Sequence, residues 1–310
     1  MRLIVITTCT DRKKFPVPSR LDASTLPVGS QSAVINVWHK RIGVARIAGP
    51  ATSVYSGRSF QEAVLAAKAS GGDFRIISGG LGLVGGDDEI PSYSLSLVSQ
   101  SAEFVGSRIA GEPFNPSHWW KGIQRSSSPS PLAKLLKRNP NALSVVGISK
   151  AYLPLIAEDL ETLSDDELER LRLVGMGIKT SCPPRLQRCV LPYDHRLDGP
   201  DSPIPGTRGD FASRAMRHFA EAIFSGERGG SIKAHKSAVS RALHSWRAPK
   251  LIARPTKTDD ELVDLIKKGW DAFEGKSSRG LRFLRDTKKV ACEQGRFRIL
   301  FQRAAREVGS

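Results

Sequence analysis

A short polar segment that follows an apolar run carries the residue types needed for acid–base chemistry on a phosphorylated substrate. The apolar run is Leu3–Ile6, and the polar segment is Thr7–Lys14 (TTCTDRKK). In parallel α/β sheets, ligands bind at the carboxyl ends of the strands. Hydroxyls, the Asp11 carboxylate and three consecutive cations at such an end offer phosphate contacts beside a general base. The alternative is that this segment is only a polar connector.

A glycine-rich segment, 78–93 (SGGLGLVGGDDEIPSY), contains a formal GxGxxG pattern. A dinucleotide site needs a helix to begin at once, so that its N-terminus meets the pyrophosphate. Here the acidic run 87–89 and Pro91 follow, which favours a loop, and the carboxylates would repel a phosphate. We therefore expect no nicotinamide or flavin site. We expect a loop whose backbone approaches a base or sugar, with Tyr93 and the carboxylates at the pocket rim.

Two polar segments spaced by glycines, 192–198 (PYDHRLD) and 206–211 (GTRGDF), form a third candidate. Asp210 falls at the start of a predicted helix, where a carboxylate can cap the helix and is favoured by its dipole. Arg196 and Arg208 flank carboxylates and could form ordinary ion pairs. Capping and ion pairing are the alternatives to a functional role. The density of polar groups favours an active-site rim.

Adjacent tryptophans, Trp119 and Trp120, lie in a proline- and serine-rich region, 111–131, that we predict to be irregular. Neighbours in a strand point to opposite sides, so the two indoles cannot both enter one core from a strand. One of them is a candidate stacking platform or wedge for a base. The alternative is a loop anchored by a buried indole.

The elements that would position these residues alternate between strands and helices. Continuous apolar runs predict buried strands at 3–6, 74–78, 143–148 and 171–175. Helical patterns follow at 60–69, 153–163 and 211–224. A further helical stretch begins at the capping-box-like segment 164–167. This alternation indicates an α/β fold with a mainly parallel sheet.

The charge is distributed unevenly over 310 residues. The chain carries +16, with 47 Lys and Arg against 31 Asp and Glu, so a polyanion partner is expected. Residues 226–310 hold 20 Lys and Arg against 10 Asp and Glu, a net of +10. We place a domain boundary at the glycine-rich break after 225, giving an α/β domain, 1–225, and a small basic all-helical domain, 226–310.

The helical domain ends in a helix with two distinct sides. Phe297, Leu300, Phe301 and Ala304 form the apolar side. Arg298, Gln302 and Arg306 form a row opposite, spaced four apart. Three short helices with such a row resemble a small duplex-binding module, and a row poor in Asn and Gln leans toward backbone contacts. The alternative is an ordinary solvated helix face.

The sequence also bears on the cellular context. No apolar run approaches the roughly 18 residues of a transmembrane helix, and the N-terminus lacks the features of a signal peptide. The four cysteines show no CxxC spacing. We expect free thiols in a cytoplasmic protein with no membrane partner, with a zinc site or a disulfide as the alternatives.

Four segments resemble an uncharacterised bacterial domain that is related to the YaaA peroxide-stress proteins and to uracil-DNA-glycosylase-like folds. They are 3–14, 51–60 (ATSVYSGRSF), 76–83 (IISGGLGL) and 90–97 (IPSYSLSL). The family pattern is a strand ending in a small-residue, Cys and Lys cluster, an LY…F helix start, an ILSA..GL strand and a PYD..L segment. Two departures stand out. Ser78-Gly79 replaces SA, and Ser94 replaces the aspartate, so Asp88 or Asp210 would have to supply that second carboxylate.

The whole chain is also similar to prokaryotic antiphage DNA glycosylases that excise glucosylated hydroxymethylcytosine from viral DNA. The resemblance implies a uracil-DNA-glycosylase-like sandwich that needs no cofactor or metal and acts on phage DNA in antiviral defence. It implies Asp11 as the water-activating general base, with Asp210 as the second candidate. The implied base pocket comprises Thr10, Gly79, Gly80, Asp88 and Tyr93. From the residue types and their placement, we expect DNA-binding residues at Arg12, Lys13, Arg58, Trp119, Trp120, Arg208, Arg298, Gln302 and Arg306.

Three functions stay open from the sequence. A monofunctional DNA glycosylase would flip a modified base into a pocket and leave an abasic site. A non-catalytic stress-related or regulatory protein would bind duplex DNA with a steep salt dependence and release no base. A nucleotide- or tRNA-modifying enzyme on the same fold is the third. The helical tail suits the first two, whereas the loops at 10–14 and 206–210 favour an enzyme.

Overall fold

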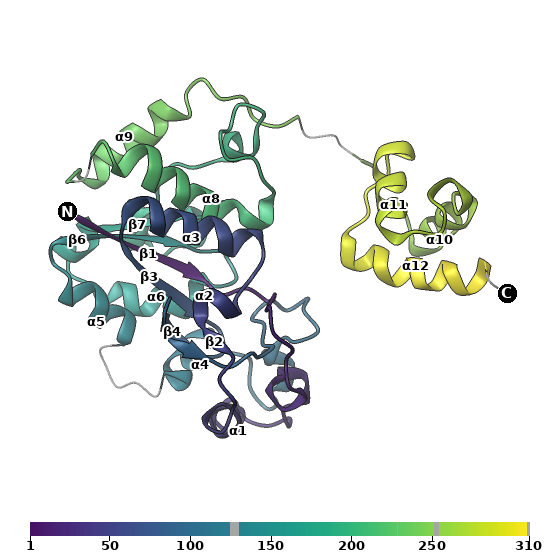
Figure 1. The fold of residues 1–310 in the computed structure, drawn as a ribbon, viewed down its shortest axis with the longest axis horizontal. Helices are drawn as coiled ribbons and strands as arrows, with labels where there is room; N and C mark the ends of the chain where they lie inside the picture. Colours follow the sequence, from purple (N-terminus) through teal and green to yellow (C-terminus); the bar gives the residue numbers. More distant parts are fainter. Residues whose placement is uncertain (125–129, 228, 251–253, 309–310) are drawn as a thin grey trace. The chain divides into compact units, whose positions relative to one another are not determined.

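The chain divides into two compact units, Met1–Pro249 and Lys250–Ser310. The structure is a computed structural model that describes residues 1–124, 130–227, 229–250 and 254–308 (Figure 1). The division lies later in the chain than the predicted boundary after residue 225. With this division the C-terminal unit has 15 Lys and Arg against nine Asp and Glu, a net of +6 out of the total of +16, so the α/β unit carries +10.

A five-stranded sheet in the order β4-β3-β1-β6-β7 forms the centre of the first unit. The strands are β1 (Arg2–Thr8), β3 (Asp73–Ser78), β4 (Gly82–Gly85), β6 (Ala142–Gly147) and β7 (Leu171–Val174). Strands β3, β1, β6 and β7 run parallel, and β4 runs antiparallel to β3. The predicted mixed α/β fold with a mostly parallel sheet is confirmed. A separate two-stranded ladder joins β2 (Gly49–Pro50) to β5 (Glu89–Ile90).

Alternating side chains of β1 pack into two cores, one on each face of the sheet, as the strand period of two requires. Leu3 and Val5 face the core that contains α3 (Arg58–Ser70) and α8 (Phe211–His218), which cover one face (Figure 1). Ile4 and Ile6 face the other core. Helices of that side are α1 (Gln31–Gly43), α4 (Pro116–Ile123), α5 (Pro131–Arg138) and α6 (Leu153–Glu161). The short helices α2 (Ala51–Val54) and α7 (Asp165–Glu169) complete the layers.

Helix α9 (Ile232–Ala242) explains why the division falls after Pro249. The buried guanidinium of Arg172, on β7, donates from Nε to Nδ1 of His235 at 2.9 Å and from Nη2 to the carbonyl of Gly230 at 2.9 Å. Val239 and Leu243 are fully buried in the same core as α3 and α8. The glycine-rich break therefore leads into a helix that belongs to the α/β unit.

The region 111–131, predicted to be irregular, contains helix α4. Asn115 caps it by accepting a hydrogen bond from the backbone of His118, and Pro116 occupies the first turn, where a missing N–H costs nothing. Residues 125–129 of this region lie outside the described residues. None of the helices in the described part of the chain combines the length and apolar character needed to cross a bilayer.

The second unit is built from helices, as predicted. Its α-helices are α10 (Asp259–Lys268), α11 (Ser277–Arg282) and α12 (Gln294–Val308). Thr258 and Glu261 form a capping box at the start of α10. Leu262, Ile266 and Phe297 are among the residues of a core separate from the two cores of the sheet. This unit therefore has its own apolar interior, as an independent domain requires.

Candidate active site at the carboxyl edge of the sheet

The order of the strands places a topological switch point at β1. The chain passes from β1 to β3 on one side and later returns to β6 on the other side. In open α/β sheets ligands bind at such a point, beyond the carboxyl ends of the strands. Three segments meet here. They are 9–14 after β1, 79–81 after β3 and 148–152 after β6.

Cys9 and Tyr152 connect two of these segments across the switch point. The Cys9 Sγ atom lies 3.4 Å from the Tyr152 hydroxyl oxygen, and the Gly79 backbone N–H donates to the same sulfur at 3.4 Å. Both side chains are only 6% exposed. The four cysteines are buried free thiols. Cys9 therefore holds together the ends of β1, β3 and β6 through polar contacts.

The hydroxyl of Ser78, the last residue of β3, is the centre of a buried network. Its Oγ atom lies 2.6 Å from the Tyr93 hydroxyl and accepts from the Tyr55 hydroxyl at 3.2 Å, while the two tyrosine oxygens lie 2.8 Å apart. The backbone N–H of Leu81 also donates to Ser78 at 3.0 Å. Burial raises the pKa of both tyrosines, so their hydroxyls stay protonated.

The position of Tyr93 corrects the prediction that it lies at the pocket rim. Tyr93 is fully buried, because its ring packs against Trp38 and Tyr55 and its hydroxyl forms a hydrogen bond with the Ser78 hydroxyl. It therefore lies at the bottom of the candidate site, beneath the loop that follows β1.

Lys13 covers this tyrosine pair. Its Nζ atom lies 4.7 Å from the ring centroid of Tyr93 and 5.2 Å from that of Tyr55, within cation–π range. The ammonium donates to the carbonyl of Thr10 at 2.6 Å and, more weakly, to that of Asp11 at 3.4 Å. Burial lowers the pKa of Lys13, and nearby anionic groups oppose that shift. Lys13 thus places a half-buried positive charge directly beside Asp11.

Asp11 is an exposed carboxylate at the end of the strand that marks the switch point. Within the described residues, no hydrogen bond or ion pair engages its carboxylate oxygens. The pKa of Asp11 is raised because neighbouring protein displaces water, with a smaller contribution from Glu103, while Lys13 opposes the shift. Thr10 braces the loop by donating to the carbonyl of Ser56 at 2.8 Å. Asp11 is therefore held in place by its backbone while its side chain stays available.

Two indoles fix the turn after β3. The Nε1–H of Trp119 donates to the carbonyl of Gly79 at 2.8 Å, and that of Trp38 donates to the carbonyl of Gly80 at 2.7 Å. A Cβ on Gly80 would come within 2.6 Å of the Tyr93 ring. The backbone of this turn therefore approaches aromatic side chains of the protein, whereas we expected it to approach a base or sugar.

The prediction that Trp119 or Trp120 acts as a wedge is wrong for this structure. Both side chains are fully buried. Trp119 is held by Gly79, and the Nε1–H of Trp120 donates to the carboxylate of Asp159 at 2.6 Å. A wedge must be exposed to reach a base step, so the alternative of a buried anchor applies to both indoles.

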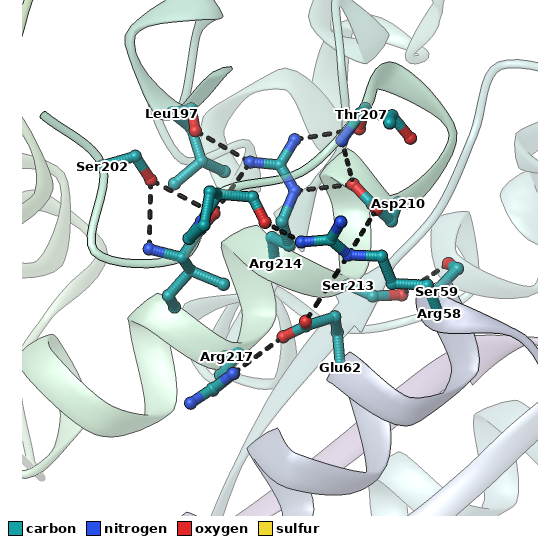
Figure 2. A network of polar contacts seen from close by, with 12 residues as sticks. Arg58, Ser59, Glu62, Leu197, Ser202, Thr207, Asp210, Ser213, Arg214 and Arg217 are labelled. Carbon is teal, nitrogen blue, oxygen red and sulfur yellow. Dashed lines mark hydrogen bonds and ion pairs between the residues drawn. The ribbon is translucent and has the colours of Figure 1, made fainter. Parts of the chain in front are cut away.

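Asp210 lies in a dense polar network instead of an open site (Figure 2). Its carboxylate accepts from Nε of Arg214 at 2.6 Å and from the backbone of Thr207 at 2.8 Å, and it pairs with Nε of Arg58 at 3.2 Å. Thr207 and Asp210 form a capping box. Asp210 is 3% exposed. The structure thus shows the capping and ion-pairing alternative for Asp210, and its oxygens are already occupied.

The fully buried side chain of Arg214 lies at the centre of this network. Its guanidinium pairs with both Asp210 and Asp198 and donates to the carbonyls of Leu197, Ile204 and Thr207. Arg58 also donates to the carbonyl of Pro205. The predicted phosphate ligand Arg58 is therefore engaged in joining α3 to the loop before α8.

The remaining predicted site residues are spread over separate places. The carboxylate of Asp88 accepts from the backbone of Gly85 at 2.7 Å. Gly85 pairs with Arg75, three residues before Ser78 along β3, so Asp88 lies away from the carboxyl edge. Arg12 and Arg208 are exposed, and their side chains form no ion pair with the described residues. Arg12 and Arg208 are thus predicted phosphate ligands whose guanidinium groups have no ion-pair partner among the described residues.

The predicted row on α12 is exposed in the second unit. Arg298, Gln302 and Arg306 all face solvent, whereas Phe297, Leu300 and Ala304 are buried. The two sides of this helix are therefore confirmed. Whether the row contacts DNA stays a prediction.

No group of His, Cys, Asp and Glu side chains within the described residues is arranged to hold a metal ion. Comparison with protein-family models, with curated proteins and with solved structures yields no match to this chain. The case for function therefore depends on the geometry of the site itself.

Sequence reasoning missed three members of the site. Tyr55, Ser78 and Tyr152 contribute the hydroxyls that surround Cys9 and Tyr93. A usable signal existed for two of them. Ser78 ends one predicted strand, and Tyr152 follows another by a few residues, so a systematic search of the carboxyl ends of all the predicted strands finds both. Tyr55 lies before a helix and carries no comparable signal.

Proposed function

We propose that the chain is a DNA glycosylase that hydrolyses the N-glycosidic bond of a modified base, with Asp11 as its general base. The α/β unit would be a uracil-DNA-glycosylase-like sandwich in this proposal. The observation that carries it is the state of the Asp11 carboxylate. It is exposed at the carboxyl end of the central strand, and within the described residues its oxygens have no hydrogen-bonding partner. The competing carboxylate, Asp210, has its oxygens occupied by Arg214, Thr207 and Arg58.

A free carboxylate at this position suits the first half of the reaction. Asp11 would accept a hydrogen bond from water, orient it toward C1′ of a flipped nucleotide, and take up the proton as the bond to the base breaks. Its negative charge would also stabilise the oxocarbenium-like transition state. The raised pKa of Asp11 makes its carboxylate a stronger proton acceptor.

The cation beside Asp11 suits the second half. When the glycosidic bond breaks, negative charge develops on the departing base, and a fixed positive charge nearby lowers the energy of that state. Lys13 supplies such a charge, held by the carbonyl of Thr10 and by the two tyrosine rings. The chemistry needs no cofactor in this scheme.

Exposed cations around the site suit a DNA strand. Arg12 and Lys14 flank Lys13 on the same loop, and Arg208 projects from the loop before α8. Phosphate contacts of this kind position the duplex without reading its sequence. Flipping a nucleotide costs a few kcal/mol, which such contacts must offset. The basic α12 row of the second unit would add a further grip on the backbone.

The decisive experiment is a base-release assay on the full chain. The protein is incubated without added metal or nucleotide with unmodified, hydroxymethylated and glucosylated phage DNA, and released bases are identified by mass spectrometry. We expect a free modified base and alkali-labile abasic sites from the glucosylated DNA. Asp11→Asn should release none, whereas Asp87→Asn, which changes an exposed carboxylate away from the site, should retain full release.

Two results would overturn the proposal. Tight, salt-sensitive DNA binding with no base released from any substrate would identify a non-catalytic DNA-binding protein instead. Full release by Asp11→Asn would show that the catalytic carboxylate lies elsewhere.

A further inference from the structure

A pocket lies at the carboxyl end of β7, the edge strand on the side of the sheet opposite β3 and β4. It has a volume of about 210 Å³. Its walls are formed by the loop after β7, the segment 190–193 and helix α9, and its lining residues are Gly175, Gly177, Ile178, Lys179, Val190, Leu191, Pro192, Tyr193 and Lys236. The lining contains two lysines and no carboxylate.

A third lysine reaches the same loop from the neighbouring strand. Gly177 has a φ of 61°, and the Nζ atom of Lys150 lies 3.4 Å from the position where a Cβ on Gly177 would stand. Lys150 follows β6, Lys179 follows β7 and Lys236 projects from α9. Three separate elements therefore bring ammonium groups to one loop.

These three charges are not neutralised by the protein. Within the described residues, neither Lys150 nor Lys179 nor Lys236 has an ion-pair partner. The pKa of Lys236 is lowered, first by burial and next by the positive charge of Lys179, with Arg172 adding to the repulsion. Like charges repel one another, and a bound anion would reduce that repulsion.

A pocket of the C-terminal unit shows the contrast. It measures about 490 Å³ and is lined by Arg254, Arg285 and Arg296. Arg254 pairs with Asp286, Arg296 pairs with Asp259, and Arg285 donates to the carbonyl of Cys292. Those cations already have partners, whereas the lysines near β7 have none within the described residues.

We propose that the pocket between the β7 loop and α9 binds a phosphate group, and that its ligand is a phosphate of the nucleic-acid strand held by the candidate active site. This second part rests on the proposed function. Lys179 and Lys236 would contact the phosphate oxygens, and Lys150 would attract the strand at the rim. The apolar walls formed by Ile178 and Val190 would exclude water from one side and strengthen the contacts.

The position of the pocket fits a strand that also reaches Asp11. Strands lie about 4.8 Å apart in a sheet, so the end of β7, two strands away from β1, is about 10 Å from the end of β1. A duplex strand advances about 3.4 Å along the helix axis per nucleotide, so the distance between the ends of β1 and β7 corresponds to only a few nucleotides. The pocket would therefore hold a phosphate a few nucleotides from a base placed at Asp11, with Lys150 between them.

The test compares the double variant Lys179→Gln/Lys236→Gln with Lys233→Gln in the full chain. Lys233 lies on the same helix as Lys236 but is exposed and lines no part of this pocket. First, inorganic phosphate is titrated into each protein while the amide and lysine resonances are followed by NMR. Second, binding of 5′-phosphorylated and unphosphorylated oligonucleotides is measured between 50 and 200 mM salt.

We expect inorganic phosphate to shift the resonances around Gly177 in the wild-type protein and in Lys233→Gln, but not in the double variant. The slope of log K against log salt should fall by about 0.7–0.9 in the double variant, since one phosphate contact is lost. Equal effects for both oligonucleotides assign the pocket to an internal phosphodiester, and a larger effect for the 5′-phosphorylated one assigns it to a terminal phosphate. Both support the inference.

The inference fails if phosphate shifts no resonance near Gly177, or if the double variant and Lys233→Gln show the same salt slope. Its failure is distinct from that of the proposed function. Base release with an unchanged salt slope would contradict the proposed phosphate pocket and support the proposed glycosylase activity. Phosphate binding near Gly177 without base release would support the proposed phosphate pocket and contradict the proposed glycosylase activity.

Discussion

The Cys9 thiol and the Tyr152 hydroxyl lie 3.4 Å apart although 143 residues separate them in the chain. Cys9 begins the loop that carries Asp11 and Lys13, and Tyr152 precedes the first residue of α6. Both side chains are buried, so water does not compete for the contact. The loop after β6 is therefore in direct contact with the loop that would carry the chemistry.

Asparagine substitutions should separate the two aspartates that the sequence singled out. Asp210→Asn should lower the free energy of unfolding by about 3 kcal/mol, because the buried guanidinium of Arg214 loses a charged partner. Asp11→Asn should change it by less than about 0.5 kcal/mol, since its carboxylate is exposed. Urea unfolding of each variant measures both values. A large loss of stability in Asp11→Asn would contradict the picture of a free carboxylate.

Removing the Ser78 hydroxyl should destabilise the buried hydrogen-bond network beneath the candidate site. Ser78→Ala takes away the shared partner of Tyr55, Tyr93 and the backbone N–H of Leu81. Buried polar groups without a partner cost about 1–3 kcal/mol, so we expect a loss of that size in urea unfolding. Ser237→Ala, an exposed change on α9, should alter stability by less than about 0.5 kcal/mol. Equal stability of the two variants would mean that the network contributes nothing.

The attachment of α9 should weaken in mild acid. Arg172 donates to Nδ1 of His235, so that imidazole is neutral and its Nε2–H donates to the carbonyl of Glu227 at 2.8 Å. Burial lowers the pKa of His235, and the charge of Arg172 adds to this, although the bond to Glu227 opposes it. The unfolded chain binds the proton more readily, at the ordinary pKa of about 6.5. The stability that His235 contributes is therefore present above about pH 6.5 and is lost as the pH falls below it.

Hydrogen exchange measures this pH effect directly. Protection factors of α9 amides should fall between about pH 7 and pH 5.5, while those of β1 should fall less. His118→Gln, which changes an exposed histidine, should leave the profile unchanged. If the protection factors of the α9 amides do not vary over this pH range, His235 either stays neutral or does not contribute to the attachment of α9.

The row on α12 should contribute to DNA affinity through charge alone. Arg298→Gln should reduce the slope of log K against log salt by about 0.9 and weaken binding to all duplexes equally. Arg303→Gln on the same helix should have a smaller effect, because Arg303 already pairs with Asp260 and Glu307. A sequence-dependent loss in Arg298→Gln would mean that the helix reads bases, and an unchanged slope would remove it from the interface.

Most of the sheet could be predicted because its strands are short apolar runs. The predicted strand at 143–148 and the observed β6, Ala142–Gly147, differ by one residue at each end. A strand buried on both faces has no polar alternation to confuse the pattern. Helix α4 departs from the predicted irregular region, because Pro113 and Pro116 favour a loop in the sequence although Pro116 occupies the first turn, where a helix tolerates proline.

The site was less predictable because its members meet through long-range contacts. Asp11 and Lys13 were found from one local segment, whereas Tyr152 reaches Cys9 only through the pairing of β1 with β6. For Trp119 and Trp120 the sequence leaves both an exposed wedge and a buried anchor open, because a pair of indoles carries no sign of its burial. The acceptors that hold them, the Gly79 carbonyl and the Asp159 carboxylate, are about 40 residues away in the sequence.

The way α9 is attached determines how the chain can be divided for experiments. A fragment ending at residue 225 would leave Arg172 buried without the imidazole and the carbonyl that satisfy its guanidinium. It would also uncover the apolar surface that Val239 and Leu243 shield. Such a fragment is expected to aggregate when expressed alone, whereas one ending at Pro249 keeps both features. The proposed base release and the proposed DNA binding can thus be tested on separate polypeptides only when the cut is made after α9.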